Sequence, residues 1–451
     1  MTLLRNTDRL RYHAPVLVCL LLVLLLVLLP TGFEDAVIYK GADRCAAQVL
    51  SVDNSSIIDT GLIRSGEQTC TLELLGGRFE GWTVEAQNLL NGSLEQDKIF
   101  SPGDRALVVI SYQGDEILLV TMTDHYRLDK EAWLALAFAL LLILFAGRTG
   151  VRAILSFVLT VLTLWKVLVP LYLKGLSPIW VGLAVTLFLT VLIIALVYGF
   201  DRRCASAVSG ATLGVLVTAA LGCLCTDLFQ IHGAVMPNSE SLLYSGYQDL
   251  NLTRIFMASI FIGSSGAVMD LSVDITSAVK EVVDKKPGMG WREAARSGMN
   301  VGRAAMGTMT TTLLLAYSGG YVALLMVFMA QGTPVWNILN YKYVASEIID
   351  TIVGSFGLVT VAPFTAVTSG YLLTRGKSPR RPRVSAPTRR TAVFLSAVPY
   401  GSALFRSLSR YWRRFYCGSH LIRQSFEWPL GAAGPPPGPM YDSSASVPAP
   451  P

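Results

Sequence analysis

Long, uninterrupted apolar runs are the feature that most constrains the fold of this chain. A helix that crosses a bilayer needs about 20 apolar residues, and several segments of the 451-residue chain reach that length. Charged residues make up only 15% of the chain, whereas soluble domains carry roughly 25%. The sequence therefore predicts an integral membrane protein and argues against a soluble enzyme.

The apolar runs predict an α-helical polytopic membrane protein of about eight transmembrane helices. The expected spans are residues 14–29, 132–147, 151–173, 177–199, 204–227, 254–280, 299–330 and 344–373. The first run follows three arginines and could also be a signal peptide. Since no small-residue cleavage site stands at 30–35, an uncleaved anchor is favoured.

Residues 34–126 differ in character and predict a small extracytoplasmic, all-β domain after the first helix. Short β-type runs such as Thr71–Leu75 and Ala106–Tyr112 are separated by turn signals such as Asn91-Gly92. This spacing suits a barrel of roughly five or six strands. We expect Cys45 and Cys70 to pair as a disulfide in oxidising surroundings; the alternative is two free, buried thiols.

The distribution of positive charge orients the chain, because cytoplasmic connectors are enriched in Lys and Arg. From Arg375 to the end, 12 Lys and Arg against 2 Asp and Glu give +10, so the rest of the chain carries about −4 of the total of +6. Basic residues also fill alternate connectors: Arg148, Arg152, Arg202, Arg203, Lys280, Lys285, Lys286, Arg292 and Arg296. We predict a multi-pass protein of the cell membrane with both termini cytoplasmic.

Four regions follow from these patterns. They are a cytoplasmic N-terminus and anchor (1–33), the β domain (34–126), a seven-helix membrane domain (127–375) and a basic, Pro-rich tail (376–451) that we expect to be disordered. The confinement of basic charge to the tail indicates membrane lipid as a partner and argues against nucleic acid. A second copy or a companion membrane protein, and an unknown transported substrate, are the other partners expected.

The chain lacks the motifs of soluble enzymes. It has no G-x-x-x-x-G-K-[ST] phosphate loop. Its four histidines (His13, His125, His232 and His420) are far apart, and no Cys/His cluster has zinc spacing. We therefore expect no catalytic residue, no metal site and no cofactor.

Acidic residues inside apolar spans carry the functional signal. Asp270 and Asp274 are four residues apart and share one helix face. A carboxylate within the bilayer costs a few kcal/mol by insertion scales and commonly marks an ion or proton path. The alternative is a buried acid that only ties helices together.

The following spans add further polar residues. We expect Arg303 at a depth similar to that of Asp274, and Thr308, Thr310 and Thr312 near Asp270. Threonines are weak indicators, because their hydroxyls often bond to their own backbone carbonyls. Glu347 and Asp350 begin the last span as additional candidate acids, and an interfacial, solvated position is favoured for Glu347.

From about residue 34 to 373 the chain resembles the YibE/F family of bacterial multi-pass membrane proteins. The motifs are G-A-V-M-D (266–270), R-S-G-M-N-V-G-R (296–303), M-G-T-M-T (306–310), L-L-L-A-Y (313–317) and S-E-I-I followed by G-S-F-G-L-V (346–359). The chain departs from the family pattern at Ala304, Thr311 and Asp350. The resemblance implies an architecture, since the family brings no established activity, and favours Asp270, Arg303 and Thr310 as site residues.

A fainter similarity connects the anchor, outer domain and G-x-x-x-D helix to one half of resistance–nodulation–division exporters and SecD-type translocases. In those proteins an intramembrane Asp takes part in proton coupling, which by analogy implies an ion-coupled secondary transporter or export factor. The alternative is a non-transporting envelope scaffold or receptor whose outer domain binds a peptide or cell-wall component. An intramembrane enzyme is disfavoured, because no nucleophile is paired with a base.

Overall fold

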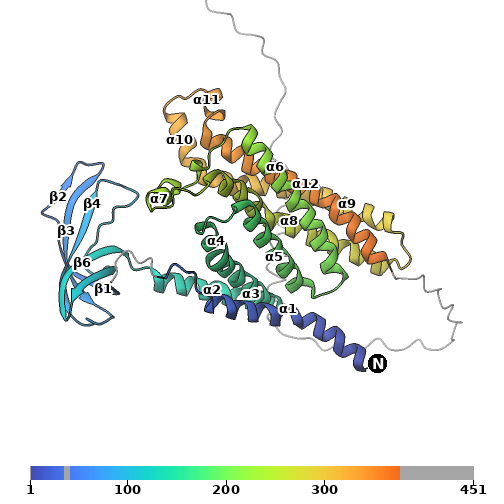
Figure 1. Ribbon diagram of the computed structural model, residues 1–451, viewed down its shortest axis with the longest axis horizontal. Helices are drawn as coiled ribbons and strands as arrows, with labels where there is room; N and C mark the ends of the chain where they lie inside the picture. The colour runs from blue at the N-terminus through green and yellow to red at the C-terminus, as the bar shows by residue number, and fades with distance from the viewer. Residues whose placement is uncertain (1, 35–40, 376–451) are drawn as a thin grey trace, which may run out of the picture. The chain divides into compact units, whose positions relative to one another are not determined.

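The computed structural model describes residues 2–34 and 41–375, which form a β domain and a helical domain (Figure 1). The α-helices are α1 (Thr2–Leu28), α2 (Leu128–Ala146), α3 (Arg148–Thr163), α4 (Val169–Leu173), α5 (Pro178–Tyr198), α6 (Arg202–Leu228), α7 (Ser239–Tyr244), α8 (Leu252–Lys285), α9 (Trp291–Ser318), α10 (Val322–Ala330), α11 (Val335–Leu339) and α12 (Lys342–Thr374). A π-helical turn, η1 (Leu164–Leu168), joins α3 to α4, and two 3₁₀ turns are η2 (Gly233–Val235) and η3 (Gly319–Tyr321). The tail at 376–451 lies outside the described residues.

The β domain is a barrel, as its sequence predicts. Its strands are β1 (Asp43–Asp53), β2 (Ile57–Asp59), β3 (Arg64–Leu74), β4 (Thr83–Asn91), β5 (Arg105–Gln113) and β6 (Glu116–His125). The sheet order is β1-β5-β6-β4-β3-β2, and an additional β1–β3 pairing closes five strands into a ring with β2 attached to β3. All pairings are antiparallel except β4 with β6. This connection of five strands is that of the OB-fold, a Greek-key barrel.

Strict alternation of burial along the strands builds the barrel core. In β4 every second residue from Ala86 to Leu90 is buried, and the residues between them are exposed. Two of the inward positions are amides, Gln68 and Asn88, and both side chains are fully buried. Gln68 Nε2 donates to the Phe100 carbonyl at 3.0 Å, and Asn88 Nδ2 donates to the Lys98 carbonyl. The two amides therefore fix the chain that leads into β5.

The prediction of a Cys45–Cys70 disulfide is wrong in this structure. Both cysteines are free thiols in the barrel core. In the β1–β3 register Cys70 lies opposite Val52. Cys45 is seven residues before Val52, a separation of about 23 Å along an extended strand. A disulfide needs Cα atoms within about 7 Å, so the register keeps the two sulfurs apart.

Six described helical segments are long and apolar enough to cross a membrane. They are Arg148–Leu173, Pro178–Tyr198, Arg202–Leu228, Leu252–Lys285, Trp291–Ala330 and Lys342–Thr374, and each corresponds to a predicted span. The count of eight is not confirmed. The apolar part of α1, His13–Leu28, is short, and the first turn of α2 is charged by Asp129, Lys130 and Glu131.

Small residues allow the central helices α6, α8, α9 and α12 to approach closely. A Cβ atom at Gly210 of α6 would lie 2.0 Å from Thr365 Oγ1, and one at Gly357 of α12 would lie 2.1 Å from Thr218 Oγ1. Gly302 of α9 faces Ala362 and Ile275 in the same way. The sequence of these helices thus specifies their packing partners through positions where no side chain fits.

Candidate functional site

One face of α8 is exposed yet carries only small or polar side chains. Its members are Ser259, Gly263, Gly266, Asp270, Asp274, Ser277 and Glu281, all exposed. The described residues of α8 include no exposed large hydrophobic side chain, whereas α5 exposes Trp180 and Phe188 and α12 exposes Ile352 and Phe356. We call the face from Ser259 to Ser277 the α8 polar face. In an apolar helix that could cross a membrane, such a face suits water, ions or a polar substrate more than lipid.

Asp270 and Asp274 both lie on the α8 polar face, one turn apart. Neither forms an ion pair in the described part of the chain, where every salt bridge involves other residues. Arg303, on α9, is also exposed and is within ion-pair distance of neither carboxylate. Arg303 and Asp274, for which we predicted a similar depth, therefore form no ion pair in the described part of the chain.

The α9 threonines use their hydroxyls locally. Thr308 donates to the Ala305 carbonyl at 3.0 Å, Thr310 to the Met306 carbonyl at 2.9 Å, and Thr312 to the Thr308 carbonyl at 3.0 Å. Such bonds to a helix's own backbone satisfy the hydroxyl. Their support for a polar path is therefore weaker than that of the two aspartates.

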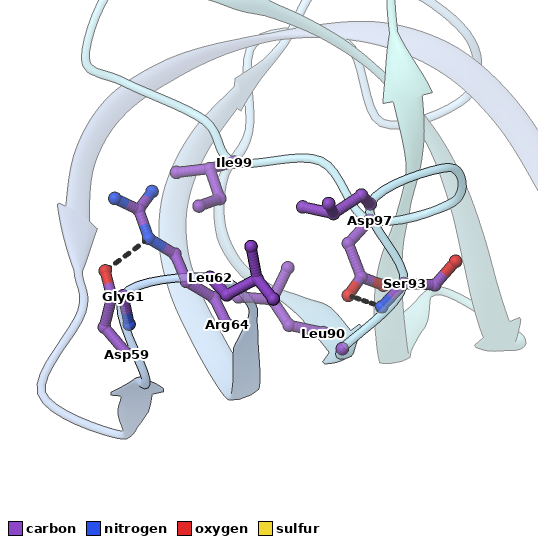
Figure 2. Close-up of a pocket in the computed structure, with 10 residues that line it drawn as sticks. Asp59, Gly61, Leu62, Arg64, Leu90, Ser93, Asp97 and Ile99 are labelled. Atoms are coloured by element: carbon purple, nitrogen blue, oxygen red, sulfur yellow. Dashed lines mark hydrogen bonds and ion pairs between the residues drawn. The ribbon is translucent and has the colours of Figure 1, made fainter. Parts of the chain in front are cut away.

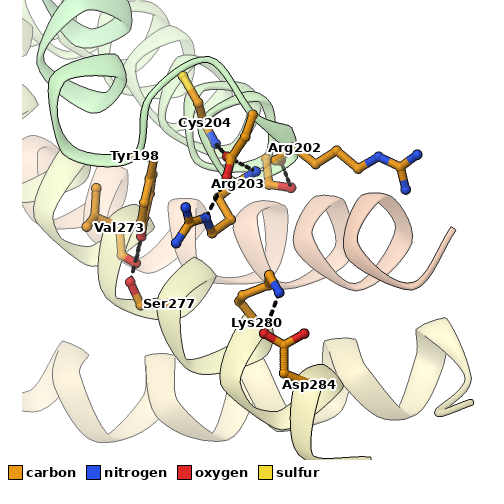
Figure 3. Close-up of polar contacts among 10 residues, drawn as sticks. Tyr198, Arg202, Arg203, Cys204, Val273, Ser277, Lys280 and Asp284 are labelled. Carbon is orange, nitrogen blue, oxygen red and sulfur yellow. Dashed lines mark hydrogen bonds and ion pairs between the residues drawn. The ribbon is translucent and has the colours of Figure 1, made fainter. Parts of the chain in front are cut away.

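A cluster that sequence reasoning missed lies beside the last part of the α8 polar face (Figure 3). The Tyr198 hydroxyl, at the end of α5, donates to the Val273 carbonyl at 2.6 Å and is 2.6 Å from Ser277 Oγ. The Arg203 guanidinium lies over the Tyr198 ring, 5.1 Å from its centroid. Its Nε also pairs with Asp201 at 2.7 Å. The only sequence signal for this cluster is a Tyr that ends an apolar run just before Asp201.

One turn further along α8 lies an ion pair. Lys280 pairs with Asp284 on the same helix, as Figure 3 shows. The side chains from Asp270 to Lys280 thus follow one another at intervals of three or four residues, which is the spacing of one helix face. The arrangement places the charged pair Lys280 and Asp284 beyond the two aspartates along α8.

Towards the other end of the α8 polar face, Gly263 lies beneath a tyrosine of α9. A Cβ atom at Gly263 would be 2.5 Å from the Tyr317 hydroxyl, so a larger residue would displace that hydroxyl. The two predicted acids of the last span, Glu347 and Asp350, are on α12, which packs against α8 and α9. Their Oε1 and Oδ1 atoms are both buried.

A separate pocket of about 230 Å³ lies in the β domain (Figure 2). It is bounded by the turn between β2 and β3 and by the segment after β4. Its apolar lining is aliphatic: Leu62, Leu90, Leu94 and Ile99. Leu62 and Leu94 are 78% and 76% exposed, so large apolar side chains face solvent at this pocket.

The charged residues of the pocket are engaged in holding its walls. Arg64 Nε bonds Asp59 at 2.7 Å, which together with the Gly61 amide keeps the pKa of Asp59 below its usual value. Asp97 accepts from the amides of Asn91 and Ser93, and these bonds lower its pKa. Across residues 41–126, 5 Lys and Arg against 13 Asp and Glu give −8. This charge disfavours nucleic acid as a ligand.

A family model described as YibE/F-like protein matches residues 134–375, which is more than half of the chain. The matched range contains all the motifs on which the sequence resemblance rests, and it begins after the β domain. Comparisons with curated proteins and with solved structures return no match.

Proposed function

The chain belongs to the YibE/F-like family, and from this membership and the geometry of α8 we propose that it is an ion-coupled secondary transporter or export factor. The family and the six apolar helices suggest a multi-pass membrane protein. Neither one alone supports transport. The observation that carries the proposal is the α8 polar face, with two unpaired carboxylates on a helix of membrane-spanning length.

In this proposal Asp270 is the group that gains and loses a proton. It lies 15 residues from Lys285, the end of α8, about 22 Å along the helix axis. An acid so placed is costly when charged, and transporters use such acids as relays. Since no cation among the described residues is in ion-pair contact with it, Asp270 is free to change charge as neighbouring helices move against α8.

From Asp270 the proposed relay proceeds through Asp274, then Ser277 and the Tyr198 hydroxyl. Because Tyr198 donates its single proton to the Val273 carbonyl, Ser277 donates to Tyr198 in the contact between their hydroxyls. Arg203, over the Tyr198 ring, marks the charged end of the bundle that this route reaches, and itself transfers no proton.

The test is proton flux in proteoliposomes that contain the full chain. We expect Asp270→Asn to keep the fold, because it preserves shape and lies on an exposed face, and to reduce flux at least tenfold. Asp274→Asn should slow flux without unfolding the protein, since no buried partner is left unpaired. The matched control is Glu281→Gln, an exposed acid on the same helix that pairs with Lys285. Wild-type flux in Asp270→Asn would end the proposal.

The pocket of the β domain supports a second candidate, an envelope scaffold or receptor that binds a peptide or cell-wall component. Barrels of this topology bind extended ligands on their strands and loops, and exposed apolar groups such as Leu62 and Leu94 mark interaction sites. The test is binding of the full chain to purified cell-wall sacculi. Binding that Leu62→Ser with Leu94→Ser abolishes, with unchanged proton flux, would favour this function.

A further inference from the structure

Three buried oxygen atoms without a hydrogen-bond partner lie within five consecutive residues of α12. They are Glu347 Oε1, Asp350 Oδ1 and Thr351 Oγ1. A buried polar atom left unpaired costs roughly 1–3 kcal/mol and more when charged. Such atoms usually find a partner in protein, water or an ion, so three together on one segment indicate a bound group.

The three side chains project from the same part of α12. Asp350 and Thr351 follow Glu347 by three and four residues, which places all three on one helix face. The Thr351 side chain is 92% buried, being only 8% exposed. Its hydroxyl is therefore a second sign of an unmet partner, independent of the two acids.

No Lys, Arg or His forms a salt bridge with Glu347 or Asp350 in the described residues. The two acids therefore lack a cation from the described part of the protein.

We propose that Glu347, Asp350 and Thr351 bind a hard divalent metal cation. Carboxylate, hydroxyl and water oxygens suit Mg²⁺, Ca²⁺ and Mn²⁺, and a dication neutralises two carboxylates at once. No group of three His, Cys, Asp or Glu capable of holding a metal occurs among the described residues. Mg²⁺-type sites commonly use only one or two carboxylates and retain several waters.

This site goes beyond the proposed proton route and does not depend on it. Asp350 is on α12, whereas Asp270 is on the α8 polar face, and the two carboxylates are not neighbours in any described contact. Gly354, one turn beyond Asp350 on α12, faces Ser264 of α8, where an added Cβ would lie 3.1 Å from the Ser264 Cβ.

The test is direct binding of Mn²⁺ to the purified full chain in nanodiscs at pH 7.5, and the bound ion is measured by electron paramagnetic resonance. We expect bound Mn²⁺ that Mg²⁺ or Ca²⁺ displaces and Na⁺ does not. Glu347→Gln and Asp350→Asn should each weaken binding at least tenfold, and Thr351→Val by a smaller factor. Asp270→Asn is the matched control and should bind Mn²⁺ as the wild type does, even where its proton flux is lost.

Two results would overturn the metal site. One is a wild-type chain that binds no Mn²⁺, in which case the two acids are held protonated. The other is unchanged binding in Glu347→Gln. If either variant fails to fold, the wild type alone decides, because a specific cation must raise its melting temperature in a concentration-dependent way. Loss of flux in Asp270→Asn without Mn²⁺ binding would refute this site and leave the proposed function standing.

Discussion

Asp270 and Asp350 are both aspartates within long apolar helices, but their surroundings differ. Asp270 lies on an exposed face of α8, whereas Asp350 has a buried, unpartnered oxygen. Depth along a helix can be counted from the sequence, but the direction of a side chain depends on which helices pack beside it. The sequence therefore identified both acids and favoured an interfacial, solvated position for Glu347, whose Oε1 the structure buries.

Tyr198→Phe tests the relay at the level of one atom. It removes a hydroxyl that contacts both Val273 and Ser277. We expect slower proton flux with a loss of stability of only about 1 kcal/mol, the value of one hydrogen bond. The control is Tyr172→Phe, which removes a comparable hydrogen bond whose acceptor, the Pro178 carbonyl, is on α5. Equal flux defects in the two variants would show that the Tyr198 hydroxyl has no special role.

Cys45 and Cys70 should remain free and unreactive in the native protein. Burial raises the pKa of Cys45, and that of Cys70 to about 11. A raised pKa means less thiolate at pH 7–8, and the thiolate is the form that reacts. We expect maleimide to label neither thiol until the protein is denatured, after which mass analysis should find both modified. A bridged pair in protein isolated with thiols trapped would contradict the structure.

At the scale of elements, the sequence predicted the β domain and six helical segments well. Alternating burial and turn residues are local signals, as in β4, and so are long apolar runs. The closure of the barrel through β1 and β3, the parallel β4–β6 pair and the distance between Cys45 and Cys70 arise from strand register, which has no local signature. The Tyr198 cluster escaped prediction for the same reason, since it joins residues about 75 positions apart.

Gly210→Ala should separate α6 from α12. The added Cβ would lie 2.0 Å from Thr365 Oγ1 and 2.8 Å from the Thr365 backbone, and backbone cannot move aside without shifting the helix. We expect a loss of about 1–3 kcal/mol, typical of overpacking, seen as a lower melting temperature in detergent. At Gly307 of α9 a Cβ meets nothing within 4 Å. Gly307→Ala should therefore be neutral or slightly stabilising, because Ala favours helix by roughly 1 kcal/mol.

At the scale of the whole molecule, the number of helices that cross the membrane decides on which side each domain lies. The six apolar segments begin at Arg148, so the β domain and α2 precede all six of them in the chain. An even number of crossings after residue 148 places Arg148 and the tail on the same side. Because α2 is the helix between the β domain and Arg148, α2 alone decides whether the β domain lies opposite that side.

The side of the β domain can be measured with reporter fusions at Ser93 and Ser385 in full-length chains. Ser93 is in the β domain, and Ser385 is in the basic tail beyond the described residues. Eight crossings predict opposite sides for the two reporters, because α2 then crosses the membrane between them. In that case the charged first turn of α2 lies at the interface, and its apolar part crosses with some thinning of the bilayer. A third fusion at Gly199, between α5 and α6, should match Ser385 in either case and controls for reporter failure. Reporters at Ser93 and Ser385 on the same side would show that α2 does not cross, and would place the pocket of Leu62 and Leu94 on the side of the tail. That outcome would remove cell-wall components from its possible ligands.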